Sequence, residues 1–233
     1  MESRWRFRSA LATIHDPFHV GGMVTTHLIP SDIAARFEVH EWRNATGILE
    51  TAHLAEWHEV IAALRAFEFR RSEVLGGGGA KSSIAGRFDG FLTDRGWVEK
   101  KFATRIKVDD EERDSPTHKV DCFKGRVGLE IEWNNKDPFF DRDLNNFRLL
   151  FDLRVIDVGI IVTRATHLQT LFKGLGIGTK YGASTTHMDK LLPRLEGGGG
   201  GGCPILAFGI TRHCYVEDDA PIVVGGSGDD DNG

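Results

Sequence analysis

The stretch 117–137 contains three acidic residues, Asp121, Glu130 and Glu132, that could together hold a cation. From residue 127 to 133, apolar residues alternate with glycine and glutamate. This alternation predicts a β-strand that carries both glutamates on one face. Asp121 lies on the strand predicted just before it. Because carboxylates gathered on one face repel each other unless a proton or a cation lies among them, the pattern predicts a shared cation site.

The register between these two strands decides how close the carboxylates come. Lys124 and Gly125 suit a two-residue hairpin turn, and that register places Asp121 opposite Gly128. Asp121 and Glu130 would then be diagonal neighbours, with their Cα atoms ~7–8 Å apart. We also expect Gly128 to leave room for a ligand. A slip of one residue would move the carboxylates to opposite faces.

The ligand types favour one kind of metal. Oxygen ligands without a nearby histidine or cysteine suit Mg²⁺, with Mn²⁺ as a substitute. A Mg²⁺ ion held by two carboxylates and by water is a common arrangement in enzymes that hydrolyse phosphodiester bonds. The alternative is an ordinary strand whose acidic side chains face the solvent. The residues alone leave both interpretations open.

The surrounding segments predict an α/β fold with a mixed central sheet flanked by helices. Apolar runs and alternating patterns predict strands, and apolar residues at every third or fourth position predict helices. We expect Ser184 or Thr185 to cap the last of these helices. Strands are predicted over 36–42, 119–123, 126–133, 155–163 and 204–211, and helices over 53–71, over 138–153 and from Met188 through Leu195. Helices that interleave with apolar strands are typical of an α/β sandwich.

The composition is that of a folded protein. The chain has 233 residues, of which 40% are hydrophobic and 27% charged. No run approaches the ~18 apolar residues that would span a membrane, so we expect no membrane contact. No apolar segment of a signal peptide follows the basic start. The three cysteines have no paired spacing, which fits the reducing cytoplasm.

Charge and glycine divide the chain into a body and a tail. Residues 1–215 are expected to form one domain, and residues 216–233 an acidic, flexible tail. The six acidic residues of that tail account for the net charge of −5, because the remaining acidic residues nearly balance the 29 basic ones. Two glycine runs, 76–79 and 197–202, are expected to be flexible loops.

Several segments follow one another over residues 117–212 in a familiar order: VDCFKGRVGLEIEWNNKD, DRDLNNFRLLFDLRVIDVGIIVTR, GTKYGASTTHMDKLLPRLEGG and CPILAFGIT. In this order they resemble the BglII/BstYI group of type II restriction endonucleases, relatives of BamHI with the PD-(D/E)xK nuclease fold. The resemblance implies a restriction-endonuclease-like sandwich and a homodimer on double-stranded DNA. It also implies Mg²⁺-dependent cleavage at a short palindrome, which leaves 5′ overhangs. Known relatives read palindromes centred on GATC.

The resemblance also gives roles to individual residues. Asp121 and Glu130 correspond to metal ligands, and the backbone carbonyl of Ile131 to a further ligand. Glu132 stands where the fold usually has a lysine. We expect its carboxylate to orient the attacking water or to bind a second metal ion.

Three polar segments are candidates for DNA contact. Asparagine suits adenine, and lysine suits guanine or phosphate. The alternatives are a turn before a helix, a capped helix start and a flexible linker. The candidate residues are Asn134, Asn135 and Lys136; Lys180, Tyr181, Ser184, Thr185 and Thr186; and Lys81 and Ser82 after the first glycine run.

Two further questions stay open at the level of sequence. Helix 138–153 carries more apolar residues than one face needs, so it either joins a dimer interface or is a buried core helix. The function also has competitors. One is a PD-(D/E)xK repair nuclease without palindrome specificity, and the other is a non-catalytic DNA-binding module.

Overall fold

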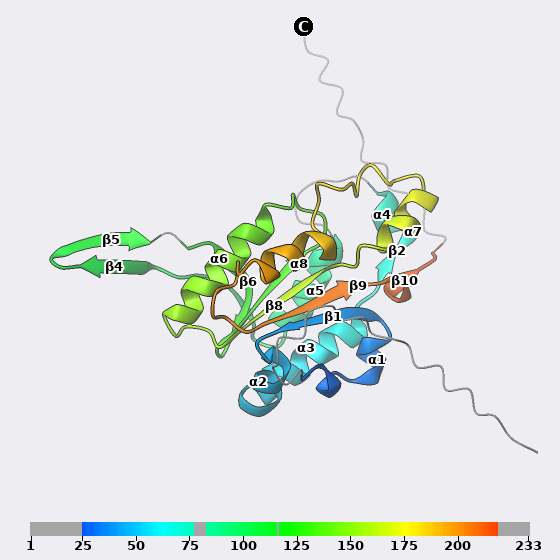
Figure 1. Cartoon of the computed structure of the whole chain (residues 1–233). Helices are drawn as coiled ribbons and strands as arrows, with labels where there is room; N and C mark the ends of the chain where they lie inside the picture. Colours follow the sequence, from blue (N-terminus) through cyan, green and yellow to red (C-terminus); the bar gives the residue numbers. More distant parts are fainter. Residues whose placement is uncertain (1–24, 77–82, 116, 219–233) are drawn as a thin grey trace, which may run out of the picture.

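A six-stranded mixed sheet lies at the centre of the computed structural model, which describes residues 25–76, 83–115 and 117–218 (Figure 1). The strand order is β1-β9-β8-β7-β6-β3. Strands β7, β8 and β9 are parallel to one another, and the other pairs are antiparallel. The strands of this sheet are β1 (Phe37–Trp42), β3 (Val98–Lys101), β6 (Lys119–Lys124), β7 (Val127–Glu132), β8 (Val158–Arg164) and β9 (Ile205–Ile210).

Helices cover both faces of this sheet. One face packs against α6 (Phe139–Asp152) and α8 (Met188–Glu196), and the other packs against α3 (Leu54–Ala66) and α5 (Ser83–Thr93). Figure 1 shows α6 and α8 on one side and α3 on the opposite side. The remaining helices are α1 (Ser31–Ala34), α2 (Ala45–Ala52), α4 (Arg71–Leu75), α7 (Leu168–Gly174) and two short 3₁₀ turns, η1 (Thr26–Leu28) and η2 (Arg212–Cys214). The predicted fold class, a mixed sheet flanked by helices, is confirmed.

The structure corrects two of the predicted elements. The helix predicted over 53–71 ends at Ala66. It stops there because Phe67 is extended and Phe69 begins β2 (Phe69–Arg70). Strand β2 pairs in parallel with β10 (Tyr215–Val216), which is distant in sequence. The last helix begins after His187, so neither predicted cap residue caps it.

Helix α6 packs closely on the sheet because two glycines face it. Gly128 and Gly159 are paired across β7 and β8, and the ring of Phe147 lies over both. A Cβ atom on Gly159 would lie 2.5 Å from Cδ2 of Phe147, which is a severe overlap. The space at Gly128, which we expected to receive a ligand, is therefore filled by this ring.

This packing gives a stability prediction. We expect Gly159→Ala to lower the free energy of unfolding by about 1–3 kcal/mol, because the buried Phe147 ring must shift. Gly90→Ala is the matched control. An added Cβ on Gly90, inside α5, meets nothing within 4 Å, so that variant should gain about 0.5–1 kcal/mol. Denaturant titrations measure both values, and an unchanged midpoint for Gly159→Ala would contradict the packing argument.

The second glycine run, 197–202, forms consecutive hydrogen-bonded turns after α8, which differs from the loose loop expected. Gly199 N donates to the Arg194 carbonyl at 2.8 Å, and Gly201 N donates to the Gly198 carbonyl at 2.9 Å. Gly201 has a φ of +57°, and a Cβ there would lie 2.6 Å from Cγ of Arg148. Glycine is thus required by close packing at this point. Of the first run, only Gly76 lies within the described residues.

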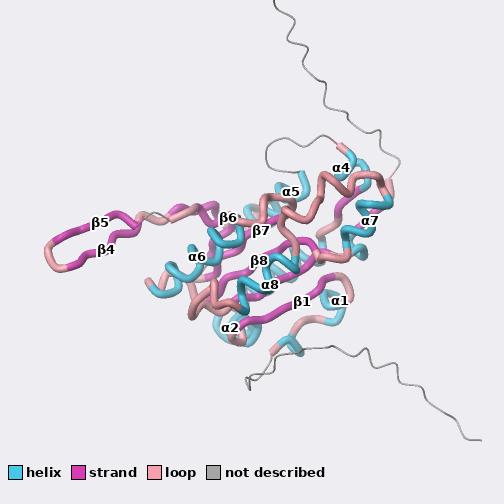
Figure 2. Tube along the Cα trace, turned by 45° about the horizontal axis from the view of Figure 1, so that its top comes forward, coloured by secondary structure: helices cyan, strands magenta, loops and turns pink. Residues whose placement is uncertain are grey.

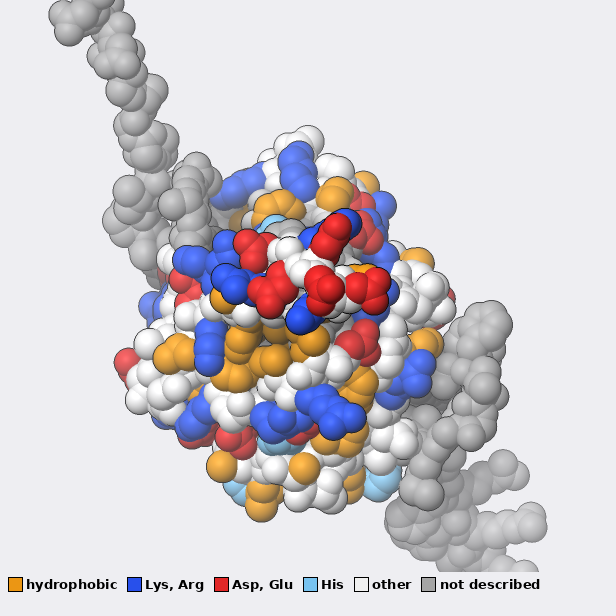
Figure 3. Space-filling model, turned by 90° about the vertical axis from the view of Figure 1, so that its left-hand side faces the viewer, with side chains coloured by type: hydrophobic (Ala, Val, Ile, Leu, Met, Phe, Trp, Pro, Cys, Tyr) orange, Lys and Arg blue, Asp and Glu red, His pale blue; other side chains and the backbone are white. Residues whose placement is uncertain are grey.

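A hairpin that the sequence did not predict projects from the body. It consists of β4 (Thr104–Val108) and β5 (Glu111–Ser115), and Figures 1 and 2 both show it extending away from the sheet. Its charges are mixed, with ion pairs such as Arg105–Asp114 and Arg113–Glu111. From the side toward which the hairpin projects, acidic and basic side chains intermix (Figure 3).

The described chain continues slightly past the predicted domain end. Beyond β10, Asp218 accepts hydrogen bonds from the backbone N–H and the hydroxyl of Ser72, at 2.9 and 2.6 Å. Residues 219–233 lie outside the described residues. The three cysteines, Cys122, Cys203 and Cys214, are buried and form no disulfide. Among the described residues, no helix combines the length and the hydrophobicity that crossing a bilayer requires.

Candidate active site

The predicted carboxylate strands form a hairpin with a register shifted by two residues from the expectation. Lys124 pairs with Val127 and Cys122 pairs with Leu129, so the turn consists of Gly125 and the residue after it. Gly125 has a φ of +56°, which a glycine adopts without strain. Because the shift is even, each side chain stays on its predicted face.

Asp121 lies where strand β6 separates from β7. The backbone pairing of the two strands stops at Cys122, and beyond it the strands are joined by hydrogen bonds that involve side chains. The Asp121 carboxylate accepts a hydrogen bond from Ile131 N at 3.4 Å, and the Glu130 carboxylate accepts one from Asp121 N at 3.3 Å. Since the N–H and C=O of a strand residue point the same way, the Ile131 carbonyl also faces this gap. The three predicted metal ligands are therefore brought together.

Glu132 is the last residue of β7, on the same face of the strand as Glu130, and it lies against helix α6. Its carboxylate accepts a hydrogen bond from the Asn135 side chain at 2.7 Å and lies 3.4 Å from the guanidinium of Arg142. The same guanidinium forms an ion pair with Asp143 at 2.7 Å. Two threonine hydroxyls, those of Thr163 and Thr186, donate to the Glu132 carbonyl. These contacts hold the backbone and the side chain at the end of β7 in position.

Burial and mutual repulsion raise the pKa values of these acids. Glu130 and Glu132 are each only 1% exposed. Burial, reinforced by the charges of Asp143 and Asp121, raises the pKa of Glu130 well above its ordinary value. Burial and Asp143 raise the pKa of Glu132 to about 9. Burial also raises the pKa of Asp143. Each of these side chains favours a proton or a cation beside it.

The sequence reading missed Asp143 and its neighbour Asn146 on α6. Both are nearly fully buried, at 1% and 2% exposure. They lie on the helix face that also carries Phe140 and Phe147, which pack in the core. Asp143 could have been recognised in the sequence, because it is a charged residue at helical spacing among the apolar residues of the buried face.

The donor set suits a divalent cation held by few protein ligands. Oε1 of Glu130 and Oδ2 of Asp143 are buried and have no hydrogen-bond partner. Within the described ranges, no three His, Cys, Asp or Glu side chains are arranged around one ion position, so the three predicted carboxylates do not form a single three-carboxylate cage. Two carboxylates and the Ile131 carbonyl remain, and Mg²⁺ commonly takes one or two carboxylates and completes its shell with water.

Two of the predicted DNA-contact segments lie side by side beyond the end of β7. Lys136 and Thr185 form an antiparallel bridge. Asp137 N donates to the Ser184 carbonyl at 3.0 Å, and Thr186 N donates to the Asn135 carbonyl at 2.9 Å. We call loops 133–137 and 180–186 together the paired loops. Asn135, Lys136 and Ser184 are exposed on them.

Three predicted contact residues are instead buried in the protein. Tyr181, Thr185 and Thr186 are 3%, 8% and 0% exposed. The Thr185 hydroxyl donates to the Gly182 carbonyl at 2.7 Å, and Tyr181 stacks on Phe172 with ring centroids 4.1 Å apart. Side chains with so little exposed surface cannot touch a duplex in this conformation. Their contacts lie within the protein and pack the loop against its surroundings.

The remaining candidates are engaged elsewhere or lie outside the described residues. The Lys180 ammonium donates to the carbonyls of Val74 and Gly76 at the end of α4, at 3.1 and 2.6 Å. The Asn134 side chain donates to the Lys180 carbonyl at 3.2 Å. Lys81 and Ser82 fall outside the described residues.

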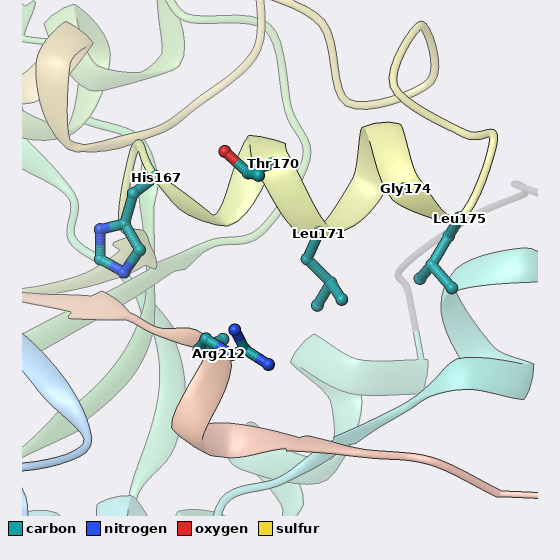
Figure 4. Close-up of a pocket in the computed structure, with 6 residues that line it drawn as sticks. All are labelled: His167, Thr170, Leu171, Gly174, Leu175 and Arg212. Carbon is teal, nitrogen blue, oxygen red and sulfur yellow. The ribbon is translucent and has the colours of Figure 1, made fainter.

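A separate hollow of about 300 Å³ lies between α7 and η2. In Figure 4, Leu171 points from α7, and Leu175 from the end of that helix, into the space beside Arg212, whereas Thr170 points away. Its other lining residues are His167 and Gly174. None of these residues belongs to the carboxylate cluster or to the paired loops, so this hollow is not the predicted site.

Comparison with known families agrees with the geometry. The family model described as restriction endonuclease BglII/BglIII matches residues 37–210, about three quarters of the chain. The match begins at the first residue of β1 and ends at the last residue of β9, so it spans the central sheet. The search of curated proteins gave no match. The chain therefore belongs to the BglII/BglIII restriction endonuclease family, and it is a type II site-specific deoxyribonuclease.

Proposed function

We propose that this protein hydrolyses both strands of double-stranded DNA at a short palindrome, with Mg²⁺ as cofactor. The observation that carries the proposal is the meeting of Asp121, Glu130 and the Ile131 backbone where β6 leaves β7. Buried acids with an unpartnered oxygen favour a cation at this point. Asp121, Glu130 and the Ile131 carbonyl would hold it. When bound, Mg²⁺ neutralises charge on the scissile phosphate and acidifies a water ligand.

In this proposal Glu132 acts on the attacking water. Its carboxylate is oriented by Asn135 and by Arg142. A cation bound nearby would favour the deprotonated form of this buried acid, which is the form that can accept a proton. The water oxygen bonds to phosphorus in line with the leaving 3′ oxygen. The bond between phosphorus and that 3′ oxygen breaks, the Glu132 carboxylate takes one proton of the water, and the 3′ oxygen takes up a proton from the solvent to become a hydroxyl. A 5′ phosphate remains.

The exposed residues of the paired loops are proposed to read the bases. The major groove admits a two-stranded ribbon. The paired loops have a similar form, because Lys136 and Thr185 form a bridge between them. Asn135 and Lys136 offer side chains that suit adenine and guanine edges. Because Asn135 also contacts Glu132, base reading and catalysis lie within one hydrogen bond of each other.

We further propose a homodimer, since each chain carries one site and a palindrome has two equivalent strands. The apolar face of α6 packs within the chain and is not available for a dimer interface. Its residues Phe140, Leu144, Phe147 and Leu150 are buried in the core. Phe139 is 36% exposed beneath the guanidinium of Arg142. Light scattering in solution should give twice the mass of one chain, and the mass of a single chain would contradict the dimer.

Digestion of a plasmid of known sequence tests the function. We expect discrete fragments with Mg²⁺ and none with EDTA. Sequenced ends should map to one palindrome, GATC-centred as in relatives, with 5′ overhangs. Ends at random positions would replace the proposal with a repair-type nuclease. Binding without cleavage on several DNA substrates would replace it with a DNA-binding module.

A further inference from the structure

Arg164, at the end of β8, is the largest polar side chain in the interior next to the site. It is only 2% exposed, and among the described residues no carboxylate forms an ion pair with it. Burial lowers its pKa to about 10, so the guanidinium still carries its charge at neutral pH. Burying an uncompensated charge is costly, so its hydrogen bonds must be specific.

The guanidinium connects the two paired loops. Its Nε donates to the Trp133 carbonyl at 2.7 Å, directly before Asn134. Its Nη2 donates to the Thr185 hydroxyl at 2.5 Å, inside the second loop. The planar fork of arginine can bond two acceptors in different directions at once, which an ammonium group does less well. One side chain thus fixes the distance between the two loops.

Aromatic rings hold the guanidinium in this position. Arg164 lies 5.2 Å from the ring centroid of Tyr181 and 5.6 Å from that of Phe172. These two rings stack on each other and anchor the second loop to α7. The rings account for the burial of Tyr181, which cannot contact DNA itself.

We propose that Arg164 is a specificity-determining positioning residue, which holds the paired loops in the one register that reads the cognate bases. The inference rests on the proposed function. It assigns no DNA contact to Arg164, whose side chain is enclosed by protein. Each correct base contact contributes roughly tenfold or more to discrimination, and loss of register weakens several contacts together.

The test is Arg164→Lys in the full chain, measured as the ratio of cleavage rates at the cognate site and at sites with one changed base pair. We expect this ratio to fall by about tenfold or more. Hydrogen exchange in the DNA-free protein gives a second readout. The amides of Asp137 and Thr186, which bond across the loops, should lose protection, while β8 and β9 keep theirs.

Arg126→Lys is the matched control. Arg126 also bridges two segments, through the Asp157 carboxylate at 2.6 Å and the Arg154 carbonyl at 2.6 Å, but it does not touch the loops. This variant should keep the wild-type ratio. A residue that matters only for stability would lower the melting temperature without changing the ratio, which is the behaviour expected of Arg126.

The outcomes separate the inference from the proposed function. If the wild-type protein cuts no defined site, the proposed function fails and the specificity role fails with it. If the wild-type protein is specific and folded Arg164→Lys keeps both the ratio and the loop protection, only the inference is overturned. If Arg164→Lys does not fold, Thr185→Val removes the same link from the other side, and an unchanged ratio in that variant overturns the inference.

Discussion

Glu130→Gln should abolish cleavage without weakening the fold. Replacing this proposed metal ligand by a neutral amide would remove charge from the proposed cation site, and we expect the cleavage rate to fall by on the order of 10³-fold. Glu130 is buried, its Oε1 has no partner, and Asp143 and Asp121 repel its charge. The neutral amide relieves this repulsion and can donate to the neighbouring carboxylates.

Two measurements check this prediction, one of cleavage activity and one of stability, and the variant should lose the first but not the second. Cleavage of a plasmid or of a short duplex should be lost, while the melting temperature of the metal-free protein should stay equal or rise, by about 2–4 °C for each kcal/mol gained. Binding to DNA without cleavage should be retained. Asp141→Asn is the control, because it removes one charge from an exposed position of α6 that pairs with Arg194. Full activity in Glu130→Gln would show that the carboxylate holds no essential metal.

Without metal, the protein should become less stable as the pH rises from 7 to 9. The raised pKa of Glu132, about 9, means that the folded state keeps a proton that the unfolded state loses near pH 4.5. The folded state therefore binds more protons in this range, and the free energy of unfolding falls as the pH rises. The slope approaches about 1.4 kcal/mol per pH unit for each proton retained. Glu130 adds to it in the same direction.

The pH range is chosen to limit the contribution of histidine and cysteine. Burial lowers the pKa of His187, so its opposite effect is confined to pH values below about 6.5. Burial raises the pKa values of Cys203 and Cys214 to about 12 and 11, and their effect begins near the ordinary value of 9. Glu132→Gln should flatten the slope between pH 7 and 9, and a steep slope that persists in this variant would contradict the assignment.

Added Mg²⁺ should reverse this loss. A ligand that binds only the folded state stabilises it, and a cation that displaces protons binds better at higher pH. Melting curves at pH 7 and pH 9, with and without Mg²⁺, should show the larger increase at pH 9. Glu130→Gln should show little increase at either pH. Equal increases in Glu130→Gln and in the wild-type protein would place the cation elsewhere.

The local pattern of the sequence determined the parts of this protein that depend on neighbours in the chain. The apolar runs of 155–163 and 204–211 indicated buried strands, and they lie within the sheet as β8 and β9. The alternation around Glu130 and Glu132 determined that both acids share a face, because side chains of a strand alternate whatever its partner is. The succession of motifs pointed to the family that the comparison shows.

The tertiary structure decided what depends on contacts between distant segments. Helix α3 ends at Ala66, shortly before Phe69 pairs with Tyr215, which is far away in the sequence. The sequence could not indicate that the ring of Phe147 fills the space at Gly128, or that Asp143 faces the carboxylates from another element. Such contacts depend on how α6 packs on the sheet, and no local pattern encodes that packing.

The same reason explains the paired loops. Their residues look alike in sequence, as polar turns and helix starts, and all were candidates for DNA contact. Only the folded chain separates them, because Arg164 and the rings around it enclose Tyr181 and Thr185 and leave Asn135 and Lys136 exposed. Residue type and spacing determined the chemistry available at this site, whereas burial, which is a property of the packed structure, decided which side chains can reach a substrate.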